Sequence, residues 1–428
     1  NHMQNLAFPA DQSVKNLFGD EPELASYGPI GLITHQLDPA LAERINHQLS
    51  MRRQTMVKER PHYLDIPGYV REDYRINVDL TRFSSGEGKA QVIDSVRGHD
   101  LFILTDVLNY GAHYNRYGSQ VSMAPDEHFL DLVRLILCCR DSAARIHVIL
   151  PYLFEGRRFR RTARESLDCG AMLRYLFELG IDNFITFDAH DSRVANAVPN
   201  CSFESFPTSY QSIRTILETV PDLQISGDSL MIVSPNEVSI NRCIFFASAM
   251  KVPLGIFYSR RDYQYIQDQL HQVVTRTYLG ESVQGKDIII VSDMLDSGSD
   301  MIASASELKT KGAKRIFCAV SFSQFTQGID KVRQAWESGI IERVFSTDMS
   351  YRPPEVLSSP WYTDIPMADD LALLISALNH DASLSRLMAP AARIEALLAE
   401  RGHLKSQDDQ EDRQLSFVDM GGPSSSQE

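Results

Sequence analysis

An acidic loop follows one of the most apolar runs in the chain. The stretch IIIVSDMLDSGSDMI (288–302) passes from four apolar residues into a turn that carries Asp293, Asp296 and Asp300, and a helical pattern then resumes. A strand that opens onto a helix N-terminus offers backbone N–H groups to an anion. The pattern therefore predicts the frame of an anion cradle, in which carboxylates at the closing end oppose the anion.

A second segment is strongly basic. PYLFEGRRFRR places Arg157, Arg158, Arg160 and Arg161 within five positions of a chain that is acidic elsewhere. Guanidinium groups match the geometry of phosphate oxygens, so one interpretation is a polyphosphate clamp. The alternative interpretation, a solvated basic loop, stays open from this segment alone.

Two further loops carry polar residues at the ends of apolar runs. FDAHDSR sets Asp188 and His190 side by side, which suits Mg²⁺ and phosphate binding or acid–base chemistry, although such a pair is more often structural. SPNEVSINR, from residue 234 to 242, follows another apolar run. Because ligands of open parallel sheets bind beyond the carboxyl ends of the strands, we expect these loops to meet.

The elements that must position these loops alternate along the chain. Apolar runs at 100–108, 145–153, 183–190, 229–235, 286–293 and 315–322 are separated by segments with helical spacing. Continuous apolar strands alternating with amphipathic helices predict parallel sheets covered on both faces, in an α/β fold. GIFY (255–258) is expected to add one more short strand.

The pattern occurs twice, which predicts two similar α/β halves. We place them at 71–220 and 221–350, after an N-terminal extension at 1–70 with a helix near 41–54. Residues 351–403 are expected to form a helix pair that packs on the second half. The charged, Gly- and Ser-rich tail at 404–428 is expected to be disordered.

Composition excludes several classes of function. A net charge of −14 and a pI near 5.3 argue against nucleic acid as the main partner. The six cysteines lack the spacing of a metal site and are typical of a reduced, cytoplasmic protein. No apolar run reaches about 18 residues and no signal-peptide pattern is found, so we expect no membrane partner.

Taken together and in this order, the four loops resemble those of the ribose-phosphate diphosphokinases, the phosphoribosyl pyrophosphate (PRPP) synthetases. The resemblance covers about residues 75 to 350, and the additional N-terminal segment is similar to a longer bacterial subgroup. It implies two phosphoribosyltransferase-like domains, each a mostly parallel sheet flanked by helices. It also implies ATP-binding roles for a set of residues: Phe83, Ser85 and Glu87 in RFSSGE, Arg157 and Arg158, and His190, which stands at a metal- and phosphate-binding histidine.

The family's reaction, a step of nucleotide biosynthesis, transfers the β,γ-diphosphoryl group of Mg-ATP to O1 of ribose 5-phosphate and yields PRPP and AMP. The stretch that contains Asp293, Asp296, Ser297, Gly298, Ser299 and Asp300 matches the family's ribose-phosphate loop. Such chemistry depends on positive charge at the transferring group. Cations and Mg²⁺ ligands should therefore be the residues that are hardest to replace.

Several of these residues are replaced here. Asn236 stands at a family Asp and Ser292 at the first Asp of a pair, while Val238 and Ser239 stand at two glycines. Ser259 occupies the position of the catalytic lysine, although Arg261 keeps the second cation. Ser299 and Asp300 stand where Gly-Thr would close on the 5-phosphate, and a carboxylate about 4 Å away would repel that phosphate by a few kcal/mol.

The departures concentrate on the diphosphoryl and ribose side, while the ATP side largely persists. The leading hypothesis is therefore a homologue impaired in autonomous catalysis, which acts as a regulatory or structural subunit with an active PRPP synthetase paralogue. One alternative is an active enzyme in which Arg158, Arg160 or Arg261 supplies the missing charge, with ATP as substrate and Mg²⁺ as cofactor. Another is a non-enzymatic nucleotide sensor or a transferase with a different acceptor. The retained RFSSGE segment implies a homo- or hetero-oligomer, since in the family it serves a neighbouring subunit's ATP site.

Overall fold

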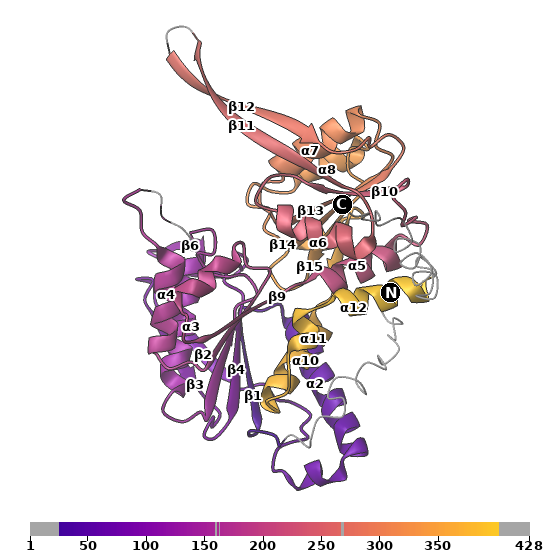
Figure 1. Cartoon of the computed structure of the whole chain (residues 1–428). Coiled ribbons are helices and arrows are strands. Elements are labelled where there is room, and N and C mark those ends of the chain that lie inside the picture. Colours follow the sequence, from indigo (N-terminus) through magenta and orange to yellow (C-terminus); the bar gives the residue numbers. More distant parts are fainter. Residues whose placement is uncertain (1–24, 159–160, 162, 267–268, 402–428) are drawn as a thin grey trace, which may run out of the picture.

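The computed structural model (Figure 1) describes residues 25–158, 161, 163–266 and 269–401. It contains two α/β units, as the sequence predicts, and each unit is built on a sheet flanked by helices. The tail expected at 404–428 lies outside the described residues. In the described part of the chain, no helix is long and apolar enough to span a bilayer.

The first sheet has five parallel strands in the order β1-β4-β7-β8-β9. These are β1 (Ile30–His35), β4 (Asp100–Thr105), β7 (Arg145–Ile149), β8 (Asn183–Phe187) and β9 (Ser202–Phe206). Every residue of β4 is buried, because both faces of the sheet are covered. Leu101 and Ile103 pack with α3 (Pro125–Cys139) and α4 (Asp168–Glu178), whereas Phe102 and Leu104 face α2 (Pro39–Glu59).

The first unit also contains two small antiparallel hairpins. They are β2 (Val78–Arg82) with β3 (Gly88–Val92), and β5 (His113–Arg116) with β6 (Ser119–Ser122). Two 3-10 helices, η1 (Pro61–Asp65) and η2 (Ser192–Ala197), complete it.

The second sheet has seven strands in the order β12-β11-β10-β13-β14-β15-β16. They are β10 (Leu230–Ser234), β11 (Leu254–Ile266), β12 (Gln269–Leu279), β13 (Asp287–Leu295), β14 (Ile316–Ser323), β15 (Arg343–Thr347) and β16 (Tyr362–Ile365). All neighbours are parallel except β11 and β12. One face packs with α5 (Ser209–Thr219) and α6 (Ile240–Met250), and the other with α7 (Ser299–Thr310) and α8 (Asp330–Glu337).

The strand expected at 255–258 is much longer than predicted. β11 continues to Ile266 and pairs with β12, and together they form a ribbon that extends away from the body of the molecule (Figure 1). The ribbon is rich in polar residues, so it lacks the continuous apolar signal of a buried strand. Cross-strand pairing, which the sequence alone does not reveal, holds it together.

The expected boundaries differ from the observed units. From β1 onward, the segment expected as a separate extension (1–70) is part of the first unit, because β1 pairs with β4 from Ile30 to His35 and α2 packs on the first sheet. At the other boundary, α5 falls within the expected first half but contacts β15 and β16 of the second sheet.

The expected C-terminal helix pair at 351–403 also differs from the structure. It includes a strand, β16, and four helices: α9 (Pro354–Leu357), α10 (Ala368–Asn379), α11 (Ser385–Met388) and α12 (Ala391–Glu400). α12 packs on α5 and α6, as expected for a cover of the second half, but α10 packs on α2 of the first unit. Arg53 of α2 donates to Asn379 Oδ1 at 2.5 Å in this contact.

Candidate functional site

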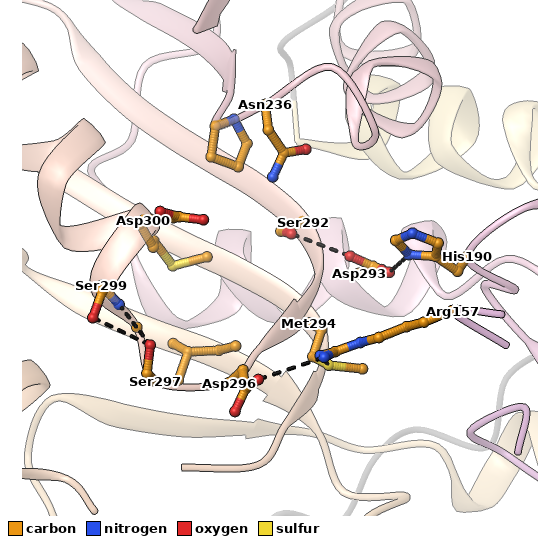
Figure 2. Close-up of a pocket in the computed structure, with 14 residues that line it drawn as sticks. Arg157, His190, Asn236, Ser292, Asp293, Met294, Asp296, Ser297, Ser299 and Asp300 are labelled. Carbon is orange, nitrogen blue, oxygen red and sulfur yellow. Dashed lines mark hydrogen bonds and ion pairs between the residues drawn. The ribbon is translucent and has the colours of Figure 1, made fainter. Parts of the chain in front are cut away.

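Strand ends from both sheets meet at one cavity of about 320 Å³ (Figure 2). Its lining comes from the loops after β7, β8 and β10, from the end of β13 and from the first turn of α7. The lining residues are Arg157, His190, Pro235, Asn236, Ser292, Asp293, Met294, Leu295, Asp296, Ser297, Gly298, Ser299, Asp300 and Met301. The convergence expected from the sequence of these four loops is therefore present.

The anion cradle is formed at the start of α7. Gly298 precedes the helix with a φ of 75°, a conformation that favours glycine. Ser297 and Ser299 place their hydroxyl oxygens 3.2 Å apart, and Lys331 of α8 donates to Ser299 Oγ at 3.2 Å. Asp300 is directed into the cavity (Figure 2), and within the described residues its carboxylate has no hydrogen-bond or ion-pair partner. An unpaired carboxylate thus stands beside the helix N-terminus.

His190 is already engaged by the opposite domain. Its Nδ1 lies 2.5 Å from Asp293 Oδ2, and Ser292 donates to the other oxygen of Asp293 at 3.3 Å. Burial raises the pKa of Asp293, but the hydrogen bond with His190 and the positive charge of Arg242 outweigh burial and hold the pKa below its usual range. Asp293 is therefore an anion that faces His190.

Arg157 is engaged in a similar way. Its Nη1 lies 3.5 Å from Asp296 Oδ2, and Thr326 donates to the other oxygen of Asp296. Both side chains of the ion pair are more than 40% exposed, so solvent screens this interaction. Arg158, in contrast, is exposed and does not line the cavity.

Asn236 turns back on its own chain. Its Oδ1 accepts hydrogen bonds from the backbone N–H groups of Val238 at 3.1 Å and Ser239 at 3.0 Å, at the start of α6. Ser239 in turn lies 3.2 Å, Oγ to Oγ, from Ser292 of β13, and both residues are buried. Four of the departures noted in the sequence are thus joined by hydrogen bonds along one wall of the cavity.

Asp188 and His190, which are two positions apart in sequence, have different hydrogen-bond partners. Asp188 has a φ of 43° and accepts hydrogen bonds from Thr208 Oγ1 at 2.5 Å and Ser321 Oγ at 2.6 Å. Arg242 lies 3.7 Å from its second oxygen. Asp188 therefore joins the end of β8 to the start of α5 and to β14 of the second sheet, which is the structural interpretation, while His190 lines the cavity.

The residues expected to contact adenine lie elsewhere. Phe83, Ser85 and Glu87 form the turn between β2 and β3, and none of them lines the cavity. Phe83 is 48% exposed, and Ser85 donates to Glu87 Oε2 at 2.9 Å. The turn also accepts a backbone hydrogen bond from Tyr117, between β5 and β6, at Ser84 O. Within one chain, these three residues are not part of the site.

Sequence reasoning missed two cations at the second-domain wall. Ser259 and Arg261 lie in β11, where their side chains are outside the described part of the structure. Directly opposite Ser259 is Arg276 of β12, whose guanidinium donates to Asp300 O at 3.0 Å and to Pro235 O at 2.9 Å. The second missed cation is Lys331, which donates to Ser299 at the cradle. The hairpin pairing that places Arg276 is the signal that the sequence did not provide.

The donor set does not form a ready-made metal cage. Among the residues that the structure describes, no three His, Cys, Asp or Glu side chains are placed to hold an ion together. Asn236 Oδ1 is occupied by backbone N–H groups and His190 Nδ1 by Asp293. Protein sites for Mg²⁺ commonly use one or two carboxylates and complete the coordination shell with substrate phosphates. This arrangement therefore fits a Mg²⁺ ion that is bound mainly by the phosphates of a nucleotide.

Comparisons with known proteins agree with the fold. Residues 30–180 match the model of the N-terminal domain of ribose phosphate pyrophosphokinase, and residues 202–352 match the phosphoribosyl transferase domain. The crystal structure of phosphoribosylpyrophosphate synthetase from Mycobacterium smegmatis is similar with a TM-score of 0.63 and 20% identity, and the match covers 83% of this chain and 100% of that chain. That likeness confirms the predicted class of two phosphoribosyltransferase-type domains.

Curated relatives match over most of the chain. A ribose-phosphate pyrophosphokinase of Vibrio parahaemolyticus is 25% identical over 318 residues, which is 73% of this chain and 90% of the relative. One from Shewanella oneidensis is 27% identical over 315 residues, with 72% and 89% covered. Ribose-phosphate pyrophosphokinase 2, chloroplastic, of Oryza sativa subsp. japonica is 28% identical over 334 residues, with 77% and 75% covered. With both domain models matched in order and along 302 residues of the chain, the protein belongs to the ribose-phosphate pyrophosphokinase family.

Proposed function

We propose that this chain is a PRPP synthetase homologue that is impaired in autonomous catalysis and acts as a regulatory or structural subunit beside an active paralogue. The observation that carries the proposal is the carboxylate of Asp300, which enters the cavity at the first turn of α7 without a partner in the described residues. The 5-phosphate of a sugar bound at this helix would meet that carboxylate. Like charges near a protein surface repel each other by a few kcal/mol at about 4 Å.

The charge balance of the cavity supports the same conclusion. Among the described residues, the lining holds three carboxylates but one arginine, and the two groups suited to nucleotide phosphates, Arg157 and His190, face Asp296 and Asp293. ATP would have to displace both contacts. Transfer of a diphosphoryl group needs excess positive charge, which the described part of this lining does not supply.

ATP and Mg²⁺ are the proposed ligands if the chain retains the binding half of the reaction. Arg157 and His190 would contact nucleotide phosphates, and Asp293 and Asp296 would accept hydrogen bonds from sugar hydroxyls. Mg²⁺, carried by the phosphates, would supply charge neutralisation. The turn at Phe83 and Glu87 would serve the site of a neighbouring subunit, in a homo-oligomer or with an active paralogue.

The decisive experiment measures AMP formation from ATP and ribose 5-phosphate. We expect little or no AMP from the purified chain, and a changed rate or effector response when it is mixed with an active family member. Robust turnover by the chain alone, abolished by His190→Ala, would overturn the proposal. Nucleotide binding without turnover and without any effect on a family member would instead favour a sensor.

One observation favours a second candidate, an active ribose-phosphate diphosphokinase. Lys331 donates to Ser299 Oγ at 3.2 Å and thus brings a cation to the cradle that the sequence motif does not include. If Lys331 offsets Asp300, the sugar phosphate could still bind and react. Turnover by the chain alone that is lost in Lys331→Met would establish this candidate.

A further inference from the structure

A partly buried arginine lies behind the second-domain wall of the cavity. Arg276 is in β12, at the base of the ribbon, and its guanidinium lies 5.4 Å from the centre of the Phe257 ring. It pairs across the ribbon with Ser259. Arg276 does not itself line the cavity, but it touches residues that do.

The guanidinium joins three elements. Nη1 donates to Asp300 O at 3.0 Å, and Nη2 donates to Pro235 O at 2.9 Å and to Ser304 Oγ at 3.0 Å. One side chain of β12 therefore holds both the loop after β10 and the first turns of α7. Within the described part of the chain, no direct hydrogen bond links that loop to α7.

The chemistry of arginine suits this task. The guanidinium is planar and its donors are fixed in a fork, so three acceptors bound to it are also fixed relative to one another. Hydrogen bonds from a charged donor are stronger than those between neutral groups. An ammonium group would bring the same charge but could not hold the three acceptors in one plane.

We propose that Arg276 is a positioning residue for the sugar-phosphate end of the cavity. It sets the separation between Pro235 and Asp300, and it keeps their carbonyl oxygens bound on the outer side, away from a ligand. Its positive charge also lies at the turn of α7 where Asp300 opposes an anion. The choice of ligands in the test rests on the proposed function, whereas the clamp itself does not.

The first test is a comparison of two ligands by calorimetry. We expect Arg276→Met to weaken binding of ribose 5-phosphate by about tenfold or more, while Mg-ATP, which is held at the Arg157 and His190 end, changes less than twofold. Arg276→Lys should recover only part of the loss, because it restores charge without the fork. Added guanidinium ion should recover binding in Arg276→Ala.

A control cation is available at the far end of α7, the helix that Arg276 contacts. Lys311, at the far end of α7, pairs with Glu307 at 3.6 Å and lies outside the cavity. Lys311→Met removes one cation from this unit and should leave both affinities unchanged. Equal loss of both ligands in Arg276→Met, together with no rescue of Arg276→Ala by guanidinium, would mean a merely structural role and would overturn the proposal. An unchanged affinity of Arg276→Met for ribose 5-phosphate would also overturn it.

A second measurement needs no ligand. Amide hydrogen exchange should become faster in 235–239 and 299–304 in Arg276→Met but not in Lys311→Met. Because exchange needs no ligand, it decides the clamp even if the wild-type chain binds neither ribose 5-phosphate nor Mg-ATP, whereas the proposed function is decided separately by AMP formation. Unchanged amide exchange in both segments of Arg276→Met would refute the clamp.

Discussion

Ser239 of α6's N-terminal cap and Ser292 of β13 share a buried hydrogen bond, with their hydroxyl oxygens 3.2 Å apart. The family pattern has a glycine at the first position and a carboxylate at the second, so two separate departures in sequence form one contact in space. The hydroxyl of Ser239 occupies the space beside β13 that a longer side chain at 292 would need.

This contact predicts coupled substitutions. Ser292→Asp should destabilise the fold by about 2–4 kcal/mol, because it buries a second carboxylate beside Asp293 against the Ser239 hydroxyl. Ser239→Gly should relieve part of that cost, with a coupling of about 1 kcal/mol in a double-mutant cycle followed by denaturant unfolding. Strictly additive effects of the two changes would show that the contact does not link them.

The unpaired carboxylate in the cradle predicts a gain of binding on its removal. Asp300→Thr should strengthen binding of ribose 5-phosphate by about tenfold or more, since it removes a repulsion of a few kcal/mol from a partly solvated position. Calorimetry at constant ionic strength measures this. Asp330→Asn, in the first turn of α8 and outside the cavity lining, is the control and should have no effect. An equal gain in both variants would point to net charge alone.

The contact between Arg157 and Asp296 predicts competition with nucleotide phosphates. Asp296→Asn should release Arg157 and raise the affinity for ATP about two- to fivefold, a modest change because the pair is exposed and screened. The gain should shrink as salt is added. Glu218→Gln, which breaks the surface pair with Arg214, serves as the control. A fall in ATP affinity would instead make Asp296 a nucleotide contact.

A buried carboxyl between the two units predicts a dependence of stability on pH. Asp106 follows β4 and accepts hydrogen bonds from the backbone N–H groups of Leu108 at 2.9 Å and Tyr351 at 2.7 Å, while burial raises its pKa to about 7. A carboxyl whose pKa is raised by folding favours the folded state when it is protonated. Its contribution is therefore full below the unfolded value near 4 and is lost as pH rises to about 7.

The measurement compares denaturation midpoints at pH 5 and pH 8. The free energy of unfolding of the wild type should fall between them by up to about 1.4 kcal/mol per pH unit over the titrating range. Asp106→Asn should be less sensitive to pH, and the difference between the two proteins isolates this one group. Parallel pH profiles for the two proteins would exclude Asp106 as the source.

The buried strands of both sheets were predictable, because β10, β13 and β14 are continuous apolar runs with both faces covered. β12 was not, since its register is set by pairing with β11 and not by a periodic pattern. β1 pairs with β4, which is distant in sequence, and β16 is only 4 residues long and joins an edge of the second sheet. Their placement depends on tertiary contacts.

At the site, the loops at strand ends were predictable and their detailed contacts were not. The rule for parallel sheets brings His190 and the 292–300 loop together, as observed. The roles of Arg276 and Lys331 depend on which backbone atoms and hydroxyls lie next to them, and no sequence spacing encodes that. The pairing of His190 with Asp293 likewise crosses between the two units.

The exchange of covering elements between the two units has a consequence for how the molecule melts. α10, near the end of the described chain, lies on α2, while α5 is carried on the second sheet, and one apolar core runs through both units. Neither unit can unfold or separate without losing a helix that covers the other unit's apolar surface. Heating should therefore give a single calorimetric peak, and proteolytic nicking between the lobes should not release a separately folded half.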